Sequence, residues 1–411
     1  MPTRKRRGAS KGISRRGFLR AGLGTAGVMA MTGGAGHYGM LRLNEFGRYP
    51  ADRLAGLRKG QSTWLFERYP GLAAHVPWRP IGSYPTPVEA LPALAGATDV
   101  LLFVKRDDLS SPLYGGNKVR KLENILADAD LGGRRTIVTA GATGTHHGLA
   151  TALHGRELGF DVRLALYRQP VTPHAQRNLR GMLLAGADTH YGGGELGTLR
   201  AVHALYRNSK SSGGAPYFVG FGGTSRLGTI GHVNAALELA EQVKAGVMPE
   251  PDRIFVALGT CGTAAGLVAG CRLAGLRARV TAVRVTPPFI ANRFAVQYLA
   301  NDVLAFLRRS EPGMPRVRVR GRDFDVAGDQ LGRGYAHGTE TGGTAMDWAR
   351  PRLALEPTYT AKALAACLDY CRQRARPGEV VLFWNTVNSA PVRQATNLDG
   401  VPEPLRAMLG A

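Results

Sequence analysis

The sequence predicts an α/β protein built on mostly parallel sheets with helices on both faces. From Thr136 onward, short apolar runs alternate with helical stretches, which is the order that strand–helix–strand units produce. The runs span 136–139, 162–166, 253–258, 280–285 and 380–384. At 411 residues the chain is long enough for two domains or one two-lobed unit. No internal repeat or long polar linker marks a boundary, and residues 209–215 are expected to form a surface loop.

A net charge of +23 raises nucleic acid or an anionic membrane as a partner. Part of this charge is local, because residues 1–20 hold eight Lys and Arg residues and no acidic residue. The remaining arginines are scattered through predicted helices and loops, without aromatic interleaving or a nucleic-acid motif. A solvated basic surface is the favoured interpretation, and no nucleic-acid partner is predicted.

Residues 1–36 are predicted to be a twin-arginine export signal. Arg15 and Arg16 are followed by Gly-Phe-Leu and then by a weakly apolar, glycine-rich stretch over 21–31. Gly33 and Ala35 are candidate small residues before a cleavage site, and an uncleaved signal would serve as a membrane anchor. We expect passage through the twin-arginine export machinery to a periplasmic or extracellular location. A disordered basic arm is the alternative.

The cysteines provide neither a disulfide framework nor a metal site. The chain has only four, and their spacing lacks a zinc pattern, so no metal is predicted. Cys367 and Cys371 fall one helical turn apart and are expected to be small apolar core residues.

Lys118 is the candidate nucleophile. It follows Gly115 and Gly116 and opens a predicted helix, shortly after an apolar strand over 100–104 and a charged turn over 105–109. A lysine held in this position can present its amine to a bound aldehyde. With 53 Lys and Arg residues in the chain, a solvated lysine on a helix face is the alternative.

The loop Gly259-Thr260-Cys261-Gly262-Thr263 is a candidate phosphate site, because it lies between a predicted strand and a predicted helix. Backbone N–H groups and the helix dipole attract an anion there, and glycine allows close approach. A tight strand-to-helix turn and the dinucleotide loop of a nicotinamide oxidoreductase are the alternatives. The full dinucleotide spacing is missing, and no acidic partner stands at the expected distance.

Lys118 and the loop 259–263 belong to a larger set of six segments along the chain. They are 84–87, 105–123, 139–142, 222–231, 259–263 and 356–363. Together they resemble the pyridoxal-phosphate (PLP) enzymes of the 1-aminocyclopropane-1-carboxylate deaminase and D-cysteine desulfhydrase family, over about residues 80–386. The resemblance implies the tryptophan synthase β-subunit-like fold, PLP fold type II, with two lobes. It places a small lobe at 120–228 and a large cofactor-binding lobe at 37–119 and 229–411.

The resemblance also implies how the cofactor is held. Lys118 would bond to PLP, Asn117 would bind its phenolic oxygen, and the loop 259–263 would hold its phosphate. A helix N-cap is the alternative role for Asn117. Thr360 would face the pyridine nitrogen, where the deaminase branch carries glutamate. A threonine cannot keep that nitrogen protonated as a carboxylate would, which favours the desulfhydrase branch.

On the substrate side the chain departs from the family pattern. Thr145, His146 and His147 stand where the family usually has Ser-Asn-His, and by resemblance this turn meets the substrate carboxylate and assists proton transfer. Packing is the alternative role for His146. Tyr359 and Tyr335 match family tyrosines beside the substrate, with a buried core tyrosine as the alternative for Tyr335.

Two further segments differ from the family pattern. His232 replaces a common tyrosine, and residues 385–388 replace His-Thr-Gly-Gly. The residues implied to bind the cofactor therefore match the family pattern better than the residues implied to bind the substrate.

The implied function is a PLP-dependent lyase acting on a small amino acid, most like D-cysteine desulfhydrase, which releases sulfide, ammonia and a keto acid. The deaminase, and another PLP lyase or racemase, are alternatives within the same class. An exported binding protein that kept the cofactor and lost turnover is the alternative from another class. The family also implies a homodimer.

Overall fold

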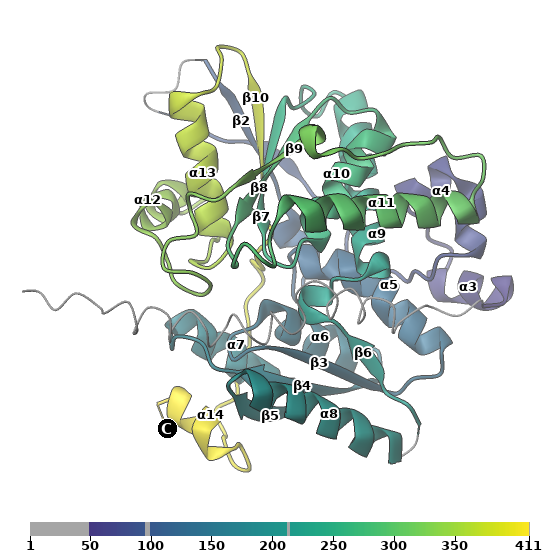
Figure 1. Ribbon diagram of the computed structural model, residues 1–411, viewed down its shortest axis with the longest axis vertical. Helices are drawn as coiled ribbons and strands as arrows, with labels where there is room; N and C mark the ends of the chain where they lie inside the picture. The colour runs from purple at the N-terminus through teal and green to yellow at the C-terminus, as the bar shows by residue number, and fades with distance from the viewer. Residues whose placement is uncertain (1–48, 95–98, 212–213, 411) are drawn as a thin grey trace, which may run out of the picture.

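The computed structural model describes residues 49–94, 99–211 and 214–410. Two separate sheets form the core of this part of the chain (Figure 1). The six-stranded sheet has the order β1-β2-β10-β7-β8-β9, and only β1 runs antiparallel to its neighbour. Its strands are β1 (Val88–Ala90), β2 (Leu101–Lys105), β7 (Arg253–Leu258), β8 (Arg279–Arg284), β9 (Phe324–Ala327) and β10 (Val380–Trp384).

The four-stranded sheet has the order β5-β4-β3-β6 and is parallel throughout. Its strands are β3 (Thr136–Ala142), β4 (Asp161–Tyr167), β5 (Asp188–Gly193) and β6 (Tyr217–Val219). All four lie within 120–228, and the strands of the larger sheet lie outside that range. The exact lobe boundaries stay a prediction, and the proposed signal segment lies outside the described residues.

The α-helices connect and cover the strands (Figure 1). They are α3 (Ala51–Arg58), α4 (Trp64–Arg68), α5 (Asn117–Leu131), α6 (His146–Glu157), α7 (Pro173–Leu184), α8 (Glu195–Ser211), α9 (Arg226–Lys244), α10 (Gly262–Ala274), α11 (Arg293–Ser310), α12 (Glu340–Ala349), α13 (Thr360–Gln373) and α14 (Glu403–Met408). Within the described residues, none of them is long and apolar enough to span a membrane.

The apolar strands are buried on both faces, as expected for parallel sheets between helices. In β7, Ile254 and Val256 pack into the cluster that contains the apolar faces of α9, α10 and α11. Phe255 and Ala257, which alternate with them, pack into a second cluster with α12 and α13. The period-two alternation of a strand therefore divides one continuous apolar run between two helical layers.

The surface loop expected at 209–215 is wrong at its start. α8 continues to Ser211, and the Ser209 hydroxyl donates to the Leu205 carbonyl oxygen at 2.7 Å. This bond to the preceding turn satisfies the Ser209 hydroxyl within the helix, so the polar composition of this segment does not end α8 at Ser209.

A buried ion network joins β2, α5 and α9 beside the larger sheet. Lys105 pairs with Glu238, and Arg120 pairs with both Asp107 (2.7 Å) and Glu238 (2.9 Å). The indole N–H of Trp384 donates to Asp107 at 2.8 Å. These side chains are almost wholly buried, so the charges must satisfy one another. The network fixes the first turn of α5 against the ends of β2 and β10.

Candidate active site

A cavity lies where the carboxyl ends of strands from both sheets meet. Residues at or just past the ends of β3, β4, β7, β8 and β10 line it, together with the amino-terminal ends of α5, α6 and α10. Ligands bind at this edge of parallel α/β sheets. Every predicted site residue except Gly262 lines the cavity. These residues are Asn117, Lys118, Thr145, His146, His147, Gly259, Thr260, Cys261, Thr263, Tyr335, Tyr359 and Thr360.

Two glycines allow α5 to begin at this cavity. Gly116 is the N-cap of α5, with a φ of +92° that favours glycine. A Cβ at Gly115 would lie 2.2 Å from the Asp108 carbonyl oxygen, and one at Gly116 would lie 2.6 Å from the Thr386 carbonyl oxygen. Because side chains do not fit there, the glycines bring α5 against the end of β10. Asn117 is the first helical residue, so its alternative role as N-cap is wrong.

The amine of Lys118 has neither a hydrogen bond nor an ion pair with any described residue, and its side chain lines the cavity. Burial lowers the pKa of Lys118 to about 8, and the negative charge of Glu356 opposes this only in part. The unprotonated amine is the nucleophile, and it is much more abundant near neutral pH than for an exposed lysine. Lys118 is therefore suited to form a bond with an aldehyde.

Lys121 follows one helical turn later on the same face of α5 and also lines the cavity. Its amine donates to the Gly222 carbonyl oxygen at 3.0 Å and to the Thr224 hydroxyl at 3.3 Å. Burial holds the pKa of Lys121 well below its usual value, and the nearby charge of Lys118 lowers it further. A Cβ at Gly262 would lie 3.1 Å from this amine, so Lys121 lies against the start of α10.

The loop 259–263 turns from β7 into α10. Cys261 is the N-cap of α10 and has a φ of 71°, and the helix runs for 13 residues from Gly262. Its amino-terminal end offers backbone N–H groups and the positive end of the helix dipole to the cavity. The Asn117 amide donates to the Thr263 hydroxyl at 2.9 Å, which joins the starts of α5 and α10. With Lys121 nearby, this corner attracts an anion.

Glu356 fixes the turn before α13. Its carboxylate accepts three backbone N–H bonds, from Thr358 at 2.8 Å, Tyr359 at 2.7 Å and Thr360 at 2.9 Å. The Thr360 hydroxyl accepts a return bond from the Glu356 N–H at 2.9 Å. These reciprocal bonds cap α13 and hold Tyr359 and Thr360 at the cavity.

Two tyrosines close another side of the cavity. The hydroxyls of Tyr335 and Tyr359 lie 2.8 Å apart, and Tyr167 lines the same cavity. Burial raises the pKa of Tyr335 well above its usual value, so the hydroxyl stays protonated. Tyr335 is partly buried and lines the cavity, so it is not a core residue alone.

The turn 145–147 opens α6. Thr145 is the N-cap, and its hydroxyl accepts from the Gly148 N–H at 3.1 Å. The His147 Nε2 lies 3.1 Å from the Thr139 hydroxyl, which donates to the Val219 carbonyl oxygen at 2.7 Å. Since that hydroxyl already donates, it accepts from His147 Nε2–H. Burial keeps the pKa of His147 well below its usual value, so the ring is neutral.

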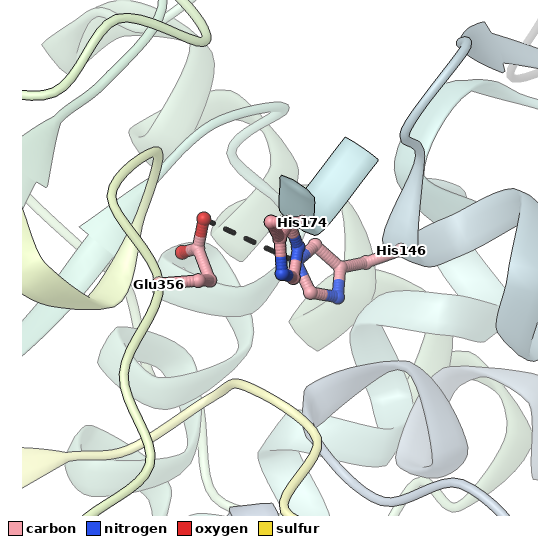
Figure 2. Close-up of side chains that lie close together, drawn as sticks. All are labelled: His146, His174 and Glu356. Carbon is pink, nitrogen blue, oxygen red and sulfur yellow. Dashed lines mark hydrogen bonds and ion pairs between the residues drawn. The ribbon is translucent and has the colours of Figure 1, made fainter. Parts of the chain in front are cut away.

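His146 belongs to a polar cluster with His174 and Glu356 (Figure 2). Its Nδ1 lies 2.7 Å from the Tyr114 hydroxyl, its Nε2 lies 2.8 Å from His174 Nε2, and the Glu356 carboxylate approaches the same Nε2 to 4.0 Å. Burial keeps the pKa of His146 well below its usual value, and the charges of His174 and Lys118 lower it further. Packing alone therefore does not account for His146.

The other departures from the family pattern are mostly away from the cavity. His232 is buried within α9 and is not among the residues that line the cavity. Thr386 and Val387 do line it. The Asn388 side chain accepts from the Gly115 N–H at 2.6 Å and so supports the turn before Lys118.

The donor set fits PLP. The Lys118 amine, which has a lowered pKa and no bonding partner among the described residues, suits the aldehyde, and the start of α10 with Lys121 suits the phosphate. The Asn117 amide is within the same cavity, and the neutral Thr360 hydroxyl can meet a ring nitrogen without protonating it.

Sequence reasoning missed four residues of this site, namely Lys121, Glu356, His174 and Tyr114. Lys121 was detectable, because it follows Lys118 at a spacing that shares one helix face. Glu356 stands in a segment already recognised, but only the fold shows its carboxylate beside His146. Tyr114 and His174 come from other segments, and nothing in their spacing indicates that they meet.

Comparison with known proteins agrees with this geometry. The family model described as pyridoxal-phosphate dependent enzyme matches residues 81–386. A D-cysteine desulfhydrase of Klebsiella pneumoniae is 31% identical over 75% of this chain and 92% of its own. A Pyrococcus furiosus protein with the provisional name 1-aminocyclopropane-1-carboxylate deaminase is 30% identical over 78% and 93%.

Among solved structures, a homologue of 1-aminocyclopropane-1-carboxylate deaminase superposes with a TM-score of 0.65 at 25% identity, over 85% of this chain and all of that chain. A hydrogen sulfide-producing enzyme from Fusobacterium nucleatum, at 14% identity and a TM-score of 0.52, shares the fold. The predicted α/β class and type II fold are confirmed. The chain belongs to the pyridoxal-phosphate dependent enzyme family and is an enzyme related to D-cysteine desulfhydrase and 1-aminocyclopropane-1-carboxylate deaminase.

Proposed function

We propose that this enzyme eliminates the β-substituent of a small amino acid, with D-cysteine as the substrate and sulfide, ammonia and a keto acid as products. The observation that carries the proposal is the amine of Lys118, which has no hydrogen bond or ion pair with a described residue and lies at the start of α5, in the same cavity as the start of α10. The neutral Thr360, in place of the glutamate of the deaminase branch, supports the desulfhydrase reaction over the deaminase reaction.

PLP supplies an aldehyde for amine exchange and an electron sink that acidifies the substrate α-carbon. Lys118 would hold the cofactor, give way to the substrate amine and then take the α-proton, because its lowered pKa suits a base near neutral pH. Asn117, Lys121 and the loop 259–263 would hold and orient the cofactor. The Thr145 turn would position the substrate carboxylate, and the paired hydroxyls of Tyr335 and Tyr359 would face the substrate.

Product analysis over a panel of D- and L-amino acids, with 1-aminocyclopropane-1-carboxylate included, tests this function. We expect D-cysteine to give sulfide and pyruvate at a rate well above that for the other substrates. Preferential turnover of the cyclopropane amino acid would contradict the assignment. Thr360→Glu should lower the rate with D-cysteine, since a carboxylate there would change the protonation of the cofactor ring.

A second candidate is racemisation of a small amino acid. It is favoured by the chain of hydrogen bonds from Tyr114 through His146 to His174, which offers a proton-transfer group at the cavity besides Lys118. Exchange of the α-proton with deuterated water, followed by chiral analysis of the recovered substrate, separates the two reactions. Solvent deuterium in a product of inverted configuration would favour racemisation.

We also propose that residues 1–36 direct the folded enzyme through the twin-arginine machinery, on the basis of the Arg15-Arg16 pair, the Phe-Leu that follows and the glycine-rich apolar stretch over 21–31. Replacing both arginines with lysine should retain the enzyme in the cytoplasm, as measured by cell fractionation. A homodimer is proposed from the family, and light scattering on the purified protein measures it.

A further inference from the structure

We propose that His146, His174 and Glu356 form a binding site for a divalent transition metal ion at the edge of the active-site cavity. One ligand atom from each of the three residues lies within 4.8 Å of the other two. In Figure 2 the two imidazoles lie side by side and the carboxylate faces them. This site goes beyond the proposed lyase function, since neither the cofactor chemistry nor the substrate requires an ion there.

The distances need only small side-chain adjustments. Ligands at about 2.0–2.1 Å from a tetrahedral ion lie about 3.3 Å from one another. The two Nε2 atoms are now 2.8 Å apart, and the Glu356 oxygen is 4.0 Å from His146 Nε2. The first distance must widen and the second must shorten, each by less than 1 Å. The third distance, between the ligand atoms of His174 and Glu356, is at most 4.8 Å and must shorten by up to about 1.5 Å to reach the same spacing.

The three donors come from separately anchored segments. His146 is the first residue of α6, and His174 is the second residue of α7. Glu356 is held by three backbone N–H bonds, two to Oε1 and one to Oε2, and Oε2 is the oxygen that faces His146. A carboxylate oxygen accepts more than one bond, so Oε2 keeps a lone pair for a ligand bond.

An outer partner is already present for one ligand. The Tyr114 hydroxyl lies 2.7 Å from His146 Nδ1, which leaves Nε2 as the inward-facing nitrogen. Metal-bound histidines usually bond through their second nitrogen in this way, and the partner fixes ring orientation. Both imidazoles are partly buried, and an unprotonated imidazole is the form that binds metal.

The ligand set indicates the class of ion. Two imidazoles and one carboxylate with open positions suit Zn²⁺ and neighbouring first-row ions, and they are a poor set for Ca²⁺ or Mg²⁺, which take mostly oxygen ligands. His146 and Glu356 also line the cavity. An open position on the ion would therefore be accessible to the thiolate or carboxylate of a small ligand. The three donors show no zinc-type spacing because they lie 28 and 182 positions apart in the chain.

Equilibrium dialysis of the purified protein against Zn²⁺ or Co²⁺, followed by metal analysis and a Co²⁺ absorption spectrum, tests the site. The measurement is made on the protein with and without PLP, so failure of the cofactor assignment does not affect it. One ion per chain and a Co²⁺ spectrum typical of low-coordinate nitrogen and oxygen ligands are expected.

Variants then assign the ligands. His174→Ala should weaken binding by more than the roughly 10–100-fold caused by loss of an outer partner, and Tyr114→Phe should weaken it within that range. His190→Ala is the matched control, since His190 is an exposed histidine paired with Asp188 at 2.8 Å, and it should bind the ion as the wild type does. Thermal unfolding of each variant checks the fold. A wild type that retains no metal, or a folded His174→Ala protein that binds as tightly, would overturn the proposal.

Discussion

Lys105 is wholly buried and Lys118 is partly buried, and they stand on either side of the same glycine-rich turn. Lys105 is wholly buried and has three partners, namely Glu238, the Thr86 carbonyl oxygen and Gln242. Lys118 has no hydrogen bond or ion pair with a described residue and lines the cavity. Burial lowers the pKa of both lysines.

The difference separates a structural charge from a reactive one. A buried amine with an anionic partner keeps its proton and stabilises the packing around it. A buried amine without one is easily deprotonated and available for bond formation. We therefore expect substitution of Lys118 to impair the chemistry and spare the fold. Substitution of Lys105 should destabilise the fold and spare the chemistry.

The largest expected effect is the loss of turnover in Lys118→Ala. Removal of the proton-transfer group alone costs about 10²–10⁴-fold in rate, and loss of the cofactor bond adds to this. The midpoint of thermal unfolding without added cofactor should not fall, because the Lys118 amine makes no hydrogen bond or ion pair within the part of the chain that the structure describes. Steady-state kinetics and calorimetry measure the two effects. A Lys118→Ala enzyme with wild-type turnover would refute the assigned role.

Lys105→Met should destabilise the fold by about 3–5 kcal/mol, because the buried Glu238 carboxylate loses one of its two cationic partners. Urea denaturation measures this free energy. Adding Glu238→Gln to Lys105→Met removes the uncompensated charge, and the double variant should lose less than the sum of the single losses. Additive losses would show that the pair does not act as a unit.

The rate of covalent PLP uptake by the cofactor-free protein should rise about tenfold per pH unit up to about pH 8 and then level off. The reason is that Lys118 reacts only when unprotonated, and its pKa is lowered to about 8. An unperturbed lysine would give a rise that continues to about pH 10. Stopped-flow absorbance over this pH range distinguishes the two curves.

The smallest effect is expected at the half-exposed ion cluster on β7, β8 and β9. Hydrogen bonds from Arg279 and Arg253 lower the pKa of Asp325 to about 2. Because the folded value lies below the unfolded value, this stabilisation is present above the unfolded pKa and is lost as the pH falls through about 2. Asp325→Asn should cost less than about 1 kcal/mol at pH 7, as partly exposed pairs do. A cost as large as that of Lys105→Met would contradict the contrast between buried and exposed charges.

The sequence was sufficient for much of the fold. Continuous apolar runs such as 253–258 and 380–384 became central parallel strands, since both faces of such strands are buried. The loop 259–263 and Lys118 were identified because each stands at a strand or helix end. Ser209 was misassigned because polar composition does not show a hydroxyl bond to the preceding turn.

The rest of the site depends on contacts between distant segments. Glu356 and His146 are brought together only when the two sheets meet, and His174 joins them from α7. The local sequence around each residue is explained by helix capping alone, and a single sequence contains no signal for such long-range pairs. The same holds for the network of Lys105, Arg120 and Glu238.

Borohydride reduction of the cofactor-loaded protein, followed by peptide mapping of the modified lysine, tests the central claim most directly. Lys118 and Lys121 line the cavity, and Lys105 lies at the end of β2. Peptide mapping shows which of these three lysines carries the label. We predict the label on Lys118 alone, in a stoichiometry of one per chain. A label on Lys121, or an unlabelled protein that takes up no PLP, would contradict the assignment of Lys118 as the reactive amine.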